Sequence, residues 1–143
     1  MELERRGTQR IRRGYAEDIY PELSGLIINA AMKVHSALGP GLLEAAYETC
    51  LCHELARRNL RFCRQVPVPI RYEEFNLDCG FRLDLVVEDK AIVELKSVDQ
   101  VLPVHHSQLL TYLKLSGLPL GLLINFNVAH LRNGIWRRVF APT

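Results

Sequence analysis

Residues 118–126 read LPLGLLINF, an almost unbroken run of apolar side chains. A strand with one face in water alternates apolar and polar residues, whereas an unbroken apolar run is typical of a strand that is buried on both faces. A sheet that contains such a strand has to be covered by other elements, most often by helices. The segment therefore predicts a buried strand inside a domain that combines a sheet with helices.

Three helical patterns can provide this cover. The first begins at Pro21 in PELSGLIINAAMKVHSAL, and Gly-Pro-Gly at 39–41 ends it because proline removes a backbone donor and glycine permits a reversal. The second is LLEAAYETCLCHELARRN, which is rich in Leu, Ala and Glu. The third is LPVHHSQLLTYLKLSG, with Pro103 in its first turn and Gly117 just past its end.

Strand-like segments fill most of the remaining chain. After Asn59 these segments are LRFCRQVPVPIRYEEF, NLDCGFRLDLVVED and KAIVELKSV. The two prolines of VPVPI favour an edge strand or an irregular entry for the first of them. At the end of the chain, HLRNGIWRRVF is expected to form a hairpin on Asn133-Gly134, a dipeptide typical of two-residue turns. The order of elements predicts one α/β domain over residues 21–143, with helices packed on its sheet.

The composition agrees with a single globular domain. The chain has 143 residues, of which 48% are hydrophobic and 24% are charged. No apolar run approaches the ~20 residues that cross a bilayer, and the charged start MELERRGTQRIRRGY lacks the apolar core of a secretory signal. We therefore expect a cytoplasmic protein without membrane contact. The cysteines show no CxxC pair and no zinc spacing, so we expect reduced, mostly buried thiols.

Positive charge is gathered in two clusters, although the net charge is only +2. Residues 1–20 are predicted to be a flexible basic extension, with Arg5, Arg6, Arg10, Arg12 and Arg13. The second cluster consists of Arg57, Arg58, Arg61 and Arg64. Such clusters can bind phosphates by long-range attraction and counterion release. A solvated tail and a solvated helix end explain them equally well, and both interpretations stay open.

The segment RLDLVVEDKAIVELK, residues 82–96, places charges within an otherwise apolar hairpin. If the loop spans residues 88–90, Asp84 lies opposite Glu94 on the same face of the sheet. Like charges in this position destabilise a hairpin unless a cation compensates them, and Lys96 or a divalent metal ion can do so. A register slipped by one residue would instead split the two carboxylates between the faces and leave an ordinary surface.

These residues belong to a wider resemblance. Asp84, Glu94 and Lys96 resemble the Asp…Glu-x-Lys signature of the PD-(D/E)XK nuclease superfamily. Upstream, GLLEAAY is similar to the motif that names the GxxExxY proteins, a group placed in that superfamily. Downstream, QLLTY resembles the Gln-xxx-Tyr helix motif of its RecB-like and phage-exonuclease-like branch. The similarity to GxxExxY proteins runs from about Leu23 to Phe140.

The resemblance implies both a fold and an activity. The fold is α/β with a restriction-endonuclease-like core, in which helices flank a mixed central β-sheet. The activity is that of a metal-dependent nuclease, a phosphodiesterase that hydrolyses nucleic acid, DNA more than RNA. Water would attack at the Asp/Glu/Lys site with Mg²⁺ as the cofactor, and Mn²⁺ would substitute for it.

Roles for individual residues follow from the same resemblance. It makes Asp84 and Glu94 metal ligands, with the carbonyl group of Leu95 as a third ligand. Glu44 would complete the ligand set directly or through water. Lys96 would orient or help to deprotonate the attacking water and would stabilise charge in the transition state.

Further candidates lie outside the Asp/Glu/Lys set. Gln108 and Tyr112 are the remaining predicted catalytic residues, and their spacing places them on one helix face. The predicted substrate-binding residues are Tyr47, His105, Arg64 and Arg82. For Tyr47 and Tyr112 a core role stays open beside the functional one, because a buried aromatic ring can fill a core while its hydroxyl group reaches a partner.

Two other kinds of function compete with the nuclease. One is a non-catalytic module that keeps the nuclease fold and binds nucleic acid or a protein. The other is a structural ion network that fixes the register of the hairpin, although buried ion pairs contribute little net stability. The sequence contains no helix-turn-helix or zinc finger, so any sequence specificity is expected to come from a partner protein or from homo-oligomerisation.

Overall fold

The computed structural model describes residues 19–141, except for the side chains of residues 78 and 79. The extension predicted for residues 1–20 therefore lies almost wholly outside the described residues. The helices are α2 (Pro21–Leu38), α3 (Glu44–Arg57), α4 (Pro103–Ser116) and the 3-10 helix η2 (Leu131–Gly134). The strands are β1 (Phe62–Tyr72), β2 (Phe75–Val87), β3 (Ala91–Lys96), β4 (Leu120–Asn125) and β5 (Ile135–Val139).

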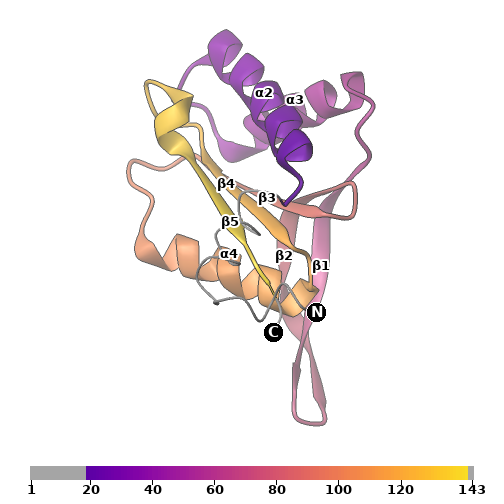
Figure 1. Cartoon of the computed structure of the whole chain (residues 1–143). Helices are drawn as coiled ribbons and strands as arrows, with labels where there is room; N and C mark the ends of the chain where they lie inside the picture. The colour runs from indigo at the N-terminus through magenta and orange to yellow at the C-terminus, as the bar shows by residue number, and fades with distance from the viewer. Residues whose placement is uncertain (1–18, 142–143) are drawn as a thin grey trace, which may run out of the picture.

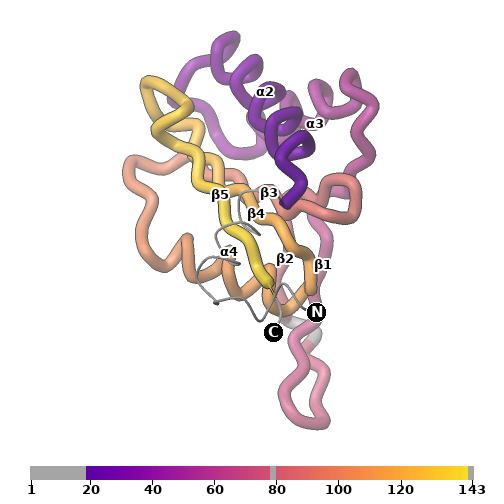
Figure 2. Tube along the Cα trace, in the orientation of Figure 1, coloured from indigo at the N-terminus to yellow at the C-terminus, as the bar shows by residue number. Residues whose placement is uncertain are grey.

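The described strands form one five-stranded sheet in the order β1-β2-β3-β4-β5 (Figure 1). Neighbouring strands are antiparallel except for β3 and β4, which are parallel. A parallel pair needs a crossover connection, and α4 forms the helical part of it (Figure 2). The predicted mixed sheet flanked by helices is confirmed.

Helices cover both faces of this sheet. One buried cluster joins α2 and α3 to strand residues such as Leu85, Val93 and Leu122. A second cluster packs α4, through Leu109 and Leu113, against side chains on the opposite face of the same strands. Every residue of β4 is buried, because its side chains alternate between these two clusters. The prediction made from LPLGLLINF is therefore confirmed.

Proline and glycine mark the helix ends as expected. Pro21 and Pro103 are the first residues of their helices. Gly39 (φ 68°) ends α2, and its N–H donates to the carbonyl oxygen of His35 at 2.7 Å. Gly117 (φ 76°) follows α4 in the left-handed conformation, where its N–H donates to the carbonyl oxygen of Leu113 at 2.9 Å.

Strand β1 is an edge strand, as its prolines indicated, and its pairing with β2 shifts register between Val68 and Ile70. Beyond this point β1 and β2 continue as a two-stranded ribbon that extends away from the rest of the sheet (Figure 2). Tyr72 and Phe75 pair across the tip of the ribbon, and both are largely exposed. The ribbon is thus attached to the domain only through its inner half.

The hairpin predicted on Asn133-Gly134 is wrong. Strand β4 ends at Asn125, and a longer connection with the 3-10 helix η2 leads to β5. Neither residue of the dipeptide has the positive φ that a type I′ turn requires. Gly134 is needed for a different reason, since a Cβ atom there would lie 2.3 Å from the carbonyl oxygen of Asn125. The backbone of η2 therefore packs directly on the end of β4.

Two composition-based expectations can also be compared with the structure. No helix among residues 19–141 is long and apolar enough to cross a membrane. Cys52 is buried and Cys50 is half-buried, whereas Cys63 is exposed. The expected burial of the thiols therefore holds for only part of the described cysteines.

Candidate active site

The charged hairpin has the register that brings its carboxylates together. Leu85 pairs with Val93, and the turn between β2 and β3 occupies residues 88–90. The same register places Asp84 opposite Glu94, as predicted. The paired residues of the two strands end at Leu85 and Val93, so the acidic residues lie where the strands begin to separate.

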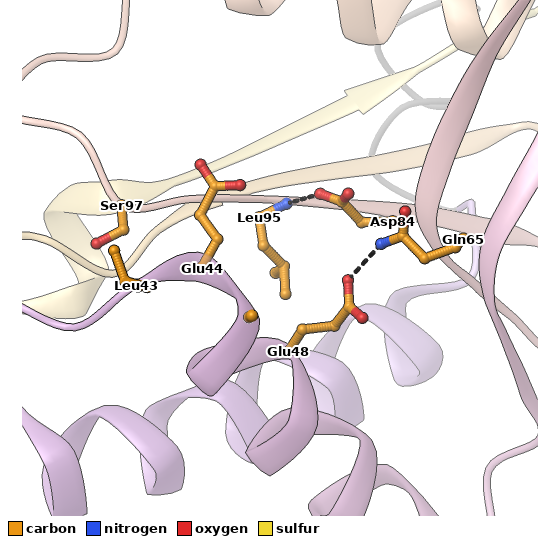
Figure 3. A pocket seen from close by; sticks show the side chains of 8 residues that line it. Leu43, Glu44, Glu48, Gln65, Asp84, Leu95 and Ser97 are labelled. Carbon is orange, nitrogen blue, oxygen red and sulfur yellow. Dashed lines mark hydrogen bonds between the residues drawn. The ribbon is translucent and has the colours of Figure 1, made fainter.

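Side-chain hydrogen bonds replace the backbone ladder at this fork. The N–H of Asp84 donates to Oε1 of Glu94 at 3.1 Å. The N–H of Leu95 donates to Oδ2 of Asp84 at 2.8 Å (Figure 3). In an extended strand the N–H and C=O groups of one residue point toward the same neighbouring strand. The carbonyl group of Leu95 is therefore directed toward the side of β3 where Asp84 lies.

Burial makes both carboxylates difficult to ionise. Glu94 is only 7% exposed, and burial, together with the charge of Asp84, raises its pKa to about 8. Burial also raises the pKa of Asp84, and the charge of Glu48 adds to this effect, whereas the hydrogen bond from Leu95 opposes it. A carboxyl group with a pKa raised as far as that of Glu94 is typical of functional sites.

Lys96 and Tyr112 lie close to this carboxylate pair. Lys96 follows Glu94 by two positions on β3, so the two side chains share a face, and its charge lowers the pKa of Asp84 and of Glu94. Tyr112 comes from α4 and stacks on Phe81 with ring centroids 4.1 Å apart. Burial and the charges of Glu94 and Asp84 raise the pKa of its phenol. The sheet and α4 therefore bring four of the predicted catalytic residues into one group.

A pocket lies between this fork and the beginning of α3. It is lined by Leu43, Glu44, Ala45, Glu48, Gln65, Asp84, Leu95 and Ser97 (Figure 3). Glu44 is the first residue of α3, and its side chain is exposed. Asp84 and Leu95 reach the pocket from the sheet, so the pocket joins the α3 side of the molecule to the acidic fork.

Glu48 is a member of the pocket that the sequence analysis missed. Its carboxylate is buried and accepts hydrogen bonds on both oxygen atoms. Oε2 accepts bonds from Nε and Nη2 of Arg64 at 3.0 and 2.8 Å, and Oε1 accepts a bond from Nε2 of Gln65 at 2.8 Å. The only signal in the sequence is the position of Glu48 one helical turn after Glu44, on the same face of α3.

Tyr47 holds the loop that leads into α3. Its hydroxyl group donates to the carbonyl oxygen of Gly39 at 2.5 Å and accepts a bond from the N–H of Leu42 at 3.2 Å. Its ring is fully buried and stacks on Phe126, with centroids 4.4 Å apart. From the other side, the hydroxyl group of Ser97 donates to the carbonyl oxygen of Leu42 at 2.5 Å. Tyr47 therefore has the core role that was left open, and its burial excludes the predicted contact with substrate in this conformation.

Comparison with known proteins shows what kind of domain this is. A family model described as the PD-(D/E)XK nuclease superfamily matches residues 21–139. The chain belongs to the PD-(D/E)XK nuclease superfamily. Comparisons with curated proteins and with solved structures gave no match. The mixed sheet with helices on both faces is consistent with the restriction-endonuclease-like core expected for this superfamily, whose members are generally nucleases.

Of the other predicted site residues of this PD-(D/E)XK domain, some lie at the pocket and others lie outside its lining. Arg64 reaches the wall of the pocket through Glu48, whereas Arg82 and Gln108 are exposed and are not part of the pocket lining. Nδ1 of His105 accepts the N–H of Leu102 at 3.0 Å, so this ring closes the first turn of α4. Contact of these residues with a substrate remains a prediction.

The arginine cluster that begins at α3 of this PD-(D/E)XK domain is engaged in ion pairs. Arg57 and Arg58 lie at 3.7 and 2.8 Å from the buried carboxylate of Glu54. Arg61 lies at 3.5 Å from Glu88, and Arg64 is paired with Glu48. These pairs favour a structural role for the cluster, although its exposed guanidinium groups still face solvent. The other basic cluster, in residues 1–20, lies outside the described residues.

PD-(D/E)XK nucleases typically use divalent metal ions, and the fork carries donor groups of the kind that such ions require. Asp84, Glu94 and the Leu95 carbonyl are oxygen donors of the kind that Mg²⁺ and Mn²⁺ prefer. Burial raises the pKa of both carboxylates, and a cation bound between them would favour their charged forms. Residues 19–141 contain no arrangement of three or more His, Cys, Asp or Glu side chains around one point. The fork therefore fits a cation through two carboxylates and a carbonyl, without Glu44.

Proposed function

We propose that this PD-(D/E)XK protein is a metal-dependent phosphodiesterase that hydrolyses nucleic acid, DNA more than RNA. The main support is the Asp84–Glu94 pair, in which Asp84 is half-buried, Glu94 is buried with a pKa of about 8, and Lys96 lies on the same face. Keeping a buried carboxylate beside a second, half-buried one destabilises a fold, and such an arrangement is typical of a site that uses their charge.

The proposed chemistry divides the work among the residues of the fork. Asp84, Glu94 and the carbonyl group of Leu95 would hold Mg²⁺, or Mn²⁺ in its place. A bound divalent ion supplies Lewis-acid polarisation of the phosphate and lowers the pKa of water. Lys96 orients the attacking water with its ammonium group and stabilises the negative charge that develops on the phosphate oxygens.

In the overall reaction, the oxygen atom of water forms a bond to phosphorus as the bond from phosphorus to the ester oxygen breaks. The leaving oxygen takes up a proton, and the products are a phosphate monoester and a hydroxyl group. Tyr112, whose phenol pKa is raised by burial and by the charges of Glu94 and Asp84, would donate a hydrogen bond to the phosphate. Gln108 would contact the phosphate. Glu44, which does not lie with Asp84 and Glu94 around one point, would act on the ion through water.

A finer classification belongs to the same proposal. The GLLEAAY segment supports membership of the GxxExxY group, and QLLTY supports the RecB-like branch. A cytoplasmic location and dependence on a partner protein or on a second copy of the chain also remain proposals.

A cleavage assay tests the activity. Single- and double-stranded DNA and RNA would be incubated with the protein in Mg²⁺ or Mn²⁺, beside Glu94→Ala, Lys96→Ala and the control Lys114→Ala. Lys114 is an exposed lysine on α4, away from the pocket lining, so its removal should leave cleavage unchanged. We expect cleavage that requires metal and falls at least ~100-fold in the Glu94 and Lys96 variants.

The alternative is a non-catalytic module that binds nucleic acid or a protein. One observation favours it, namely that the described residues do not arrange three metal-binding side chains around one point. Calorimetry with Mn²⁺ separates the two proposals. An absence of both cleavage and Mn²⁺ binding in the wild-type protein would contradict the nuclease and leave the binding module.

A further inference from the structure

Gln65 has an unusual backbone conformation for its place in the fold. It lies inside strand β1, yet its φ of 50° is in the left-handed region that side chains other than glycine rarely adopt. Other described non-glycine residues with positive φ lie beside helices or in hairpin turns, namely Tyr20, Asn59, Glu73, Glu88 and Asp89. A strained residue within a strand costs about 1–3 kcal/mol and points to a functional constraint.

The strain at Gln65 occurs directly across from the acidic fork. In the pairing of β1 with β2, Arg64 faces Leu85 and Val66 faces Leu83, while Gln65 is skipped. This register sets Gln65 opposite Asp84, and both side chains line the same pocket. The unusual backbone therefore occurs at the β1 position closest in register to a signature residue of the family.

The side chain of Gln65 is held in one orientation. Its Nε2 donates to Oε1 of Glu48 at 2.8 Å, and Arg64 binds the other oxygen of the same carboxylate. Figure 3 shows the amide of Gln65 projecting from β1 into the pocket toward Glu48 and Asp84. No second partner for this amide occurs among residues 19–141. One N–H and the amide oxygen therefore remain available to a ligand.

Stabilising Glu48 does not by itself explain this arrangement. Two hydrogen bonds from Arg64 already neutralise the carboxylate, and Gln65 adds one uncharged bond at the cost of backbone strain. A neutral amide does have an advantage in this pocket. It can donate to an anionic oxygen close to Asp84 without being captured in an ion pair, as the guanidinium group of Arg64 is by Glu48.

We propose that Gln65 is a substrate-contacting residue of this site, whose free amide N–H donates to a non-bridging oxygen of the phosphodiester on the α3 side of Asp84. Glu48, held by Arg64, is the positioning residue that aims this amide. The proposal rests on the proposed nuclease function and adds a contact from β1 to those from β3 and α4. The ligand class is a nucleic-acid phosphodiester.

The test uses a substitution that separates strain from function. Gln65→Gly removes the amide but permits the positive φ, so the protein should keep or increase its thermal stability. Glu73→Gly is the matched control, because Glu73 has φ 51° at the exposed turn between β1 and β2 and does not line the pocket. Both variants relieve similar strain, but only the first alters the pocket.

Two measurements are made on these variants. Steady-state cleavage gives kcat and KM, and fluorescence anisotropy gives the affinity for a labelled oligonucleotide in a Lys96→Ala background, where cleavage does not consume the probe. We expect Gln65→Gly to lower kcat/KM and affinity by roughly 10- to 100-fold, the range for a lost bond to a charged acceptor. The Glu73→Gly variant should match its parent in both assays.

Unchanged affinity and kcat/KM in Gln65→Gly, with raised stability, would overturn the proposal and leave only local strain. A clear loss of stability would also overturn it, because Gln65 would then serve mainly to hold Glu48 in the fold. If the Lys96→Ala parent binds no oligonucleotide and the wild type cleaves none, the nuclease function itself is contradicted. The proposed contact of Gln65 with the phosphodiester then fails as well. Binding by the parent therefore distinguishes the two failures.

Discussion

Asp84 and Glu94 each accept a backbone N–H that a regular ladder would have given to a carbonyl group. This exchange lets two carboxylates occupy the fork without leaving buried donors unpaired. The two hydrogen bonds do not offset the cost of burying the charge of Glu94, because its pKa is about 8 whereas a free glutamate ionises near 4.5. The fold therefore favours the protonated form of Glu94 at neutral pH.

The pH dependence of stability follows from this shift. Between about pH 4.5 and 8 the folded state binds a proton at Glu94 that the unfolded state has released, so this group lowers the free energy of unfolding as pH rises. Glu94→Gln removes the titration and should stabilise the protein by about 1–4 kcal/mol at pH 9 but little at pH 5. Urea denaturation at both pH values, in the presence of a chelator, measures the difference.

Glu88→Gln provides the contrast for this experiment. Glu88 is on the same hairpin, but its carboxylate accepts a hydrogen bond from the backbone N–H of Arg61, which lowers its pKa. Its contribution to stability is therefore present above the pKa of the unfolded state and is lost as pH falls through the pKa of the folded state. This variant should lose stability at pH 9. Equal pH profiles for Glu94→Gln and the wild type would contradict the burial of a titrating pair.

At the scale of elements, the loop between α2 and α3 positions the start of α3, where Glu44 is the first residue. Three hydrogen bonds from two side chains hold this loop, and two of them end on the backbone of Leu42. Tyr47 belongs to α3, whereas Ser97 directly follows β3. The loop thus connects the start of α3 with the end of the strand that carries Glu94 and Lys96.

Tyr47→Phe should test this connection. The change keeps the stacking on Phe126 but removes both hydroxyl bonds, so we expect a loss of about 1–3 kcal/mol in the free energy of unfolding. Ser97→Ala removes the third bond. If the loop moves as a unit, the double variant should lose less than the sum of the single losses, which chemical denaturation of all four proteins will reveal. Strict additivity would argue against a shared loop.

At the scale of the whole molecule, β4 lies in the middle of two apolar clusters that share its opposite faces. Damage to either cluster should therefore affect both layers. The single tryptophan, Trp136, packs against the cluster that contains α4 and reports on that layer. Far-ultraviolet circular dichroism reports on all helices, including α2 and α3 on the other face.

We expect residues 21–143 to unfold as one cooperative domain. In a thermal or urea titration, the transitions seen by Trp136 fluorescence and by circular dichroism should coincide. Leu123→Ala, on the α4 side of β4, should lower both midpoints together, by a free energy of about 2–5 kcal/mol. Two separated transitions would show that the layers are independent units.

Sequence patterns anticipated those parts of the molecule that depend on local chemistry. The central strand, the helix ends and the hairpin register all follow from periodicity or from proline and glycine within a few residues. Gly134 was misinterpreted because its requirement is a close approach to Asn125, which only the folded chain creates. Glu48 and Gln65 were missed for the same reason, since their partners come from different elements.

The end of the backbone ladder at the fork makes two amide protons unusually informative. The N–H groups of Asp84 and Leu95 donate to the very carboxylates that are expected to meet the ion. Their resonance frequencies should follow the ionisation of these carboxylates, because an amide bonded to an anion is strongly deshielded. Nuclear magnetic resonance of these two signals would register the arrival of Mg²⁺ at the fork without substrate and without turnover, since the protein already contains the probes.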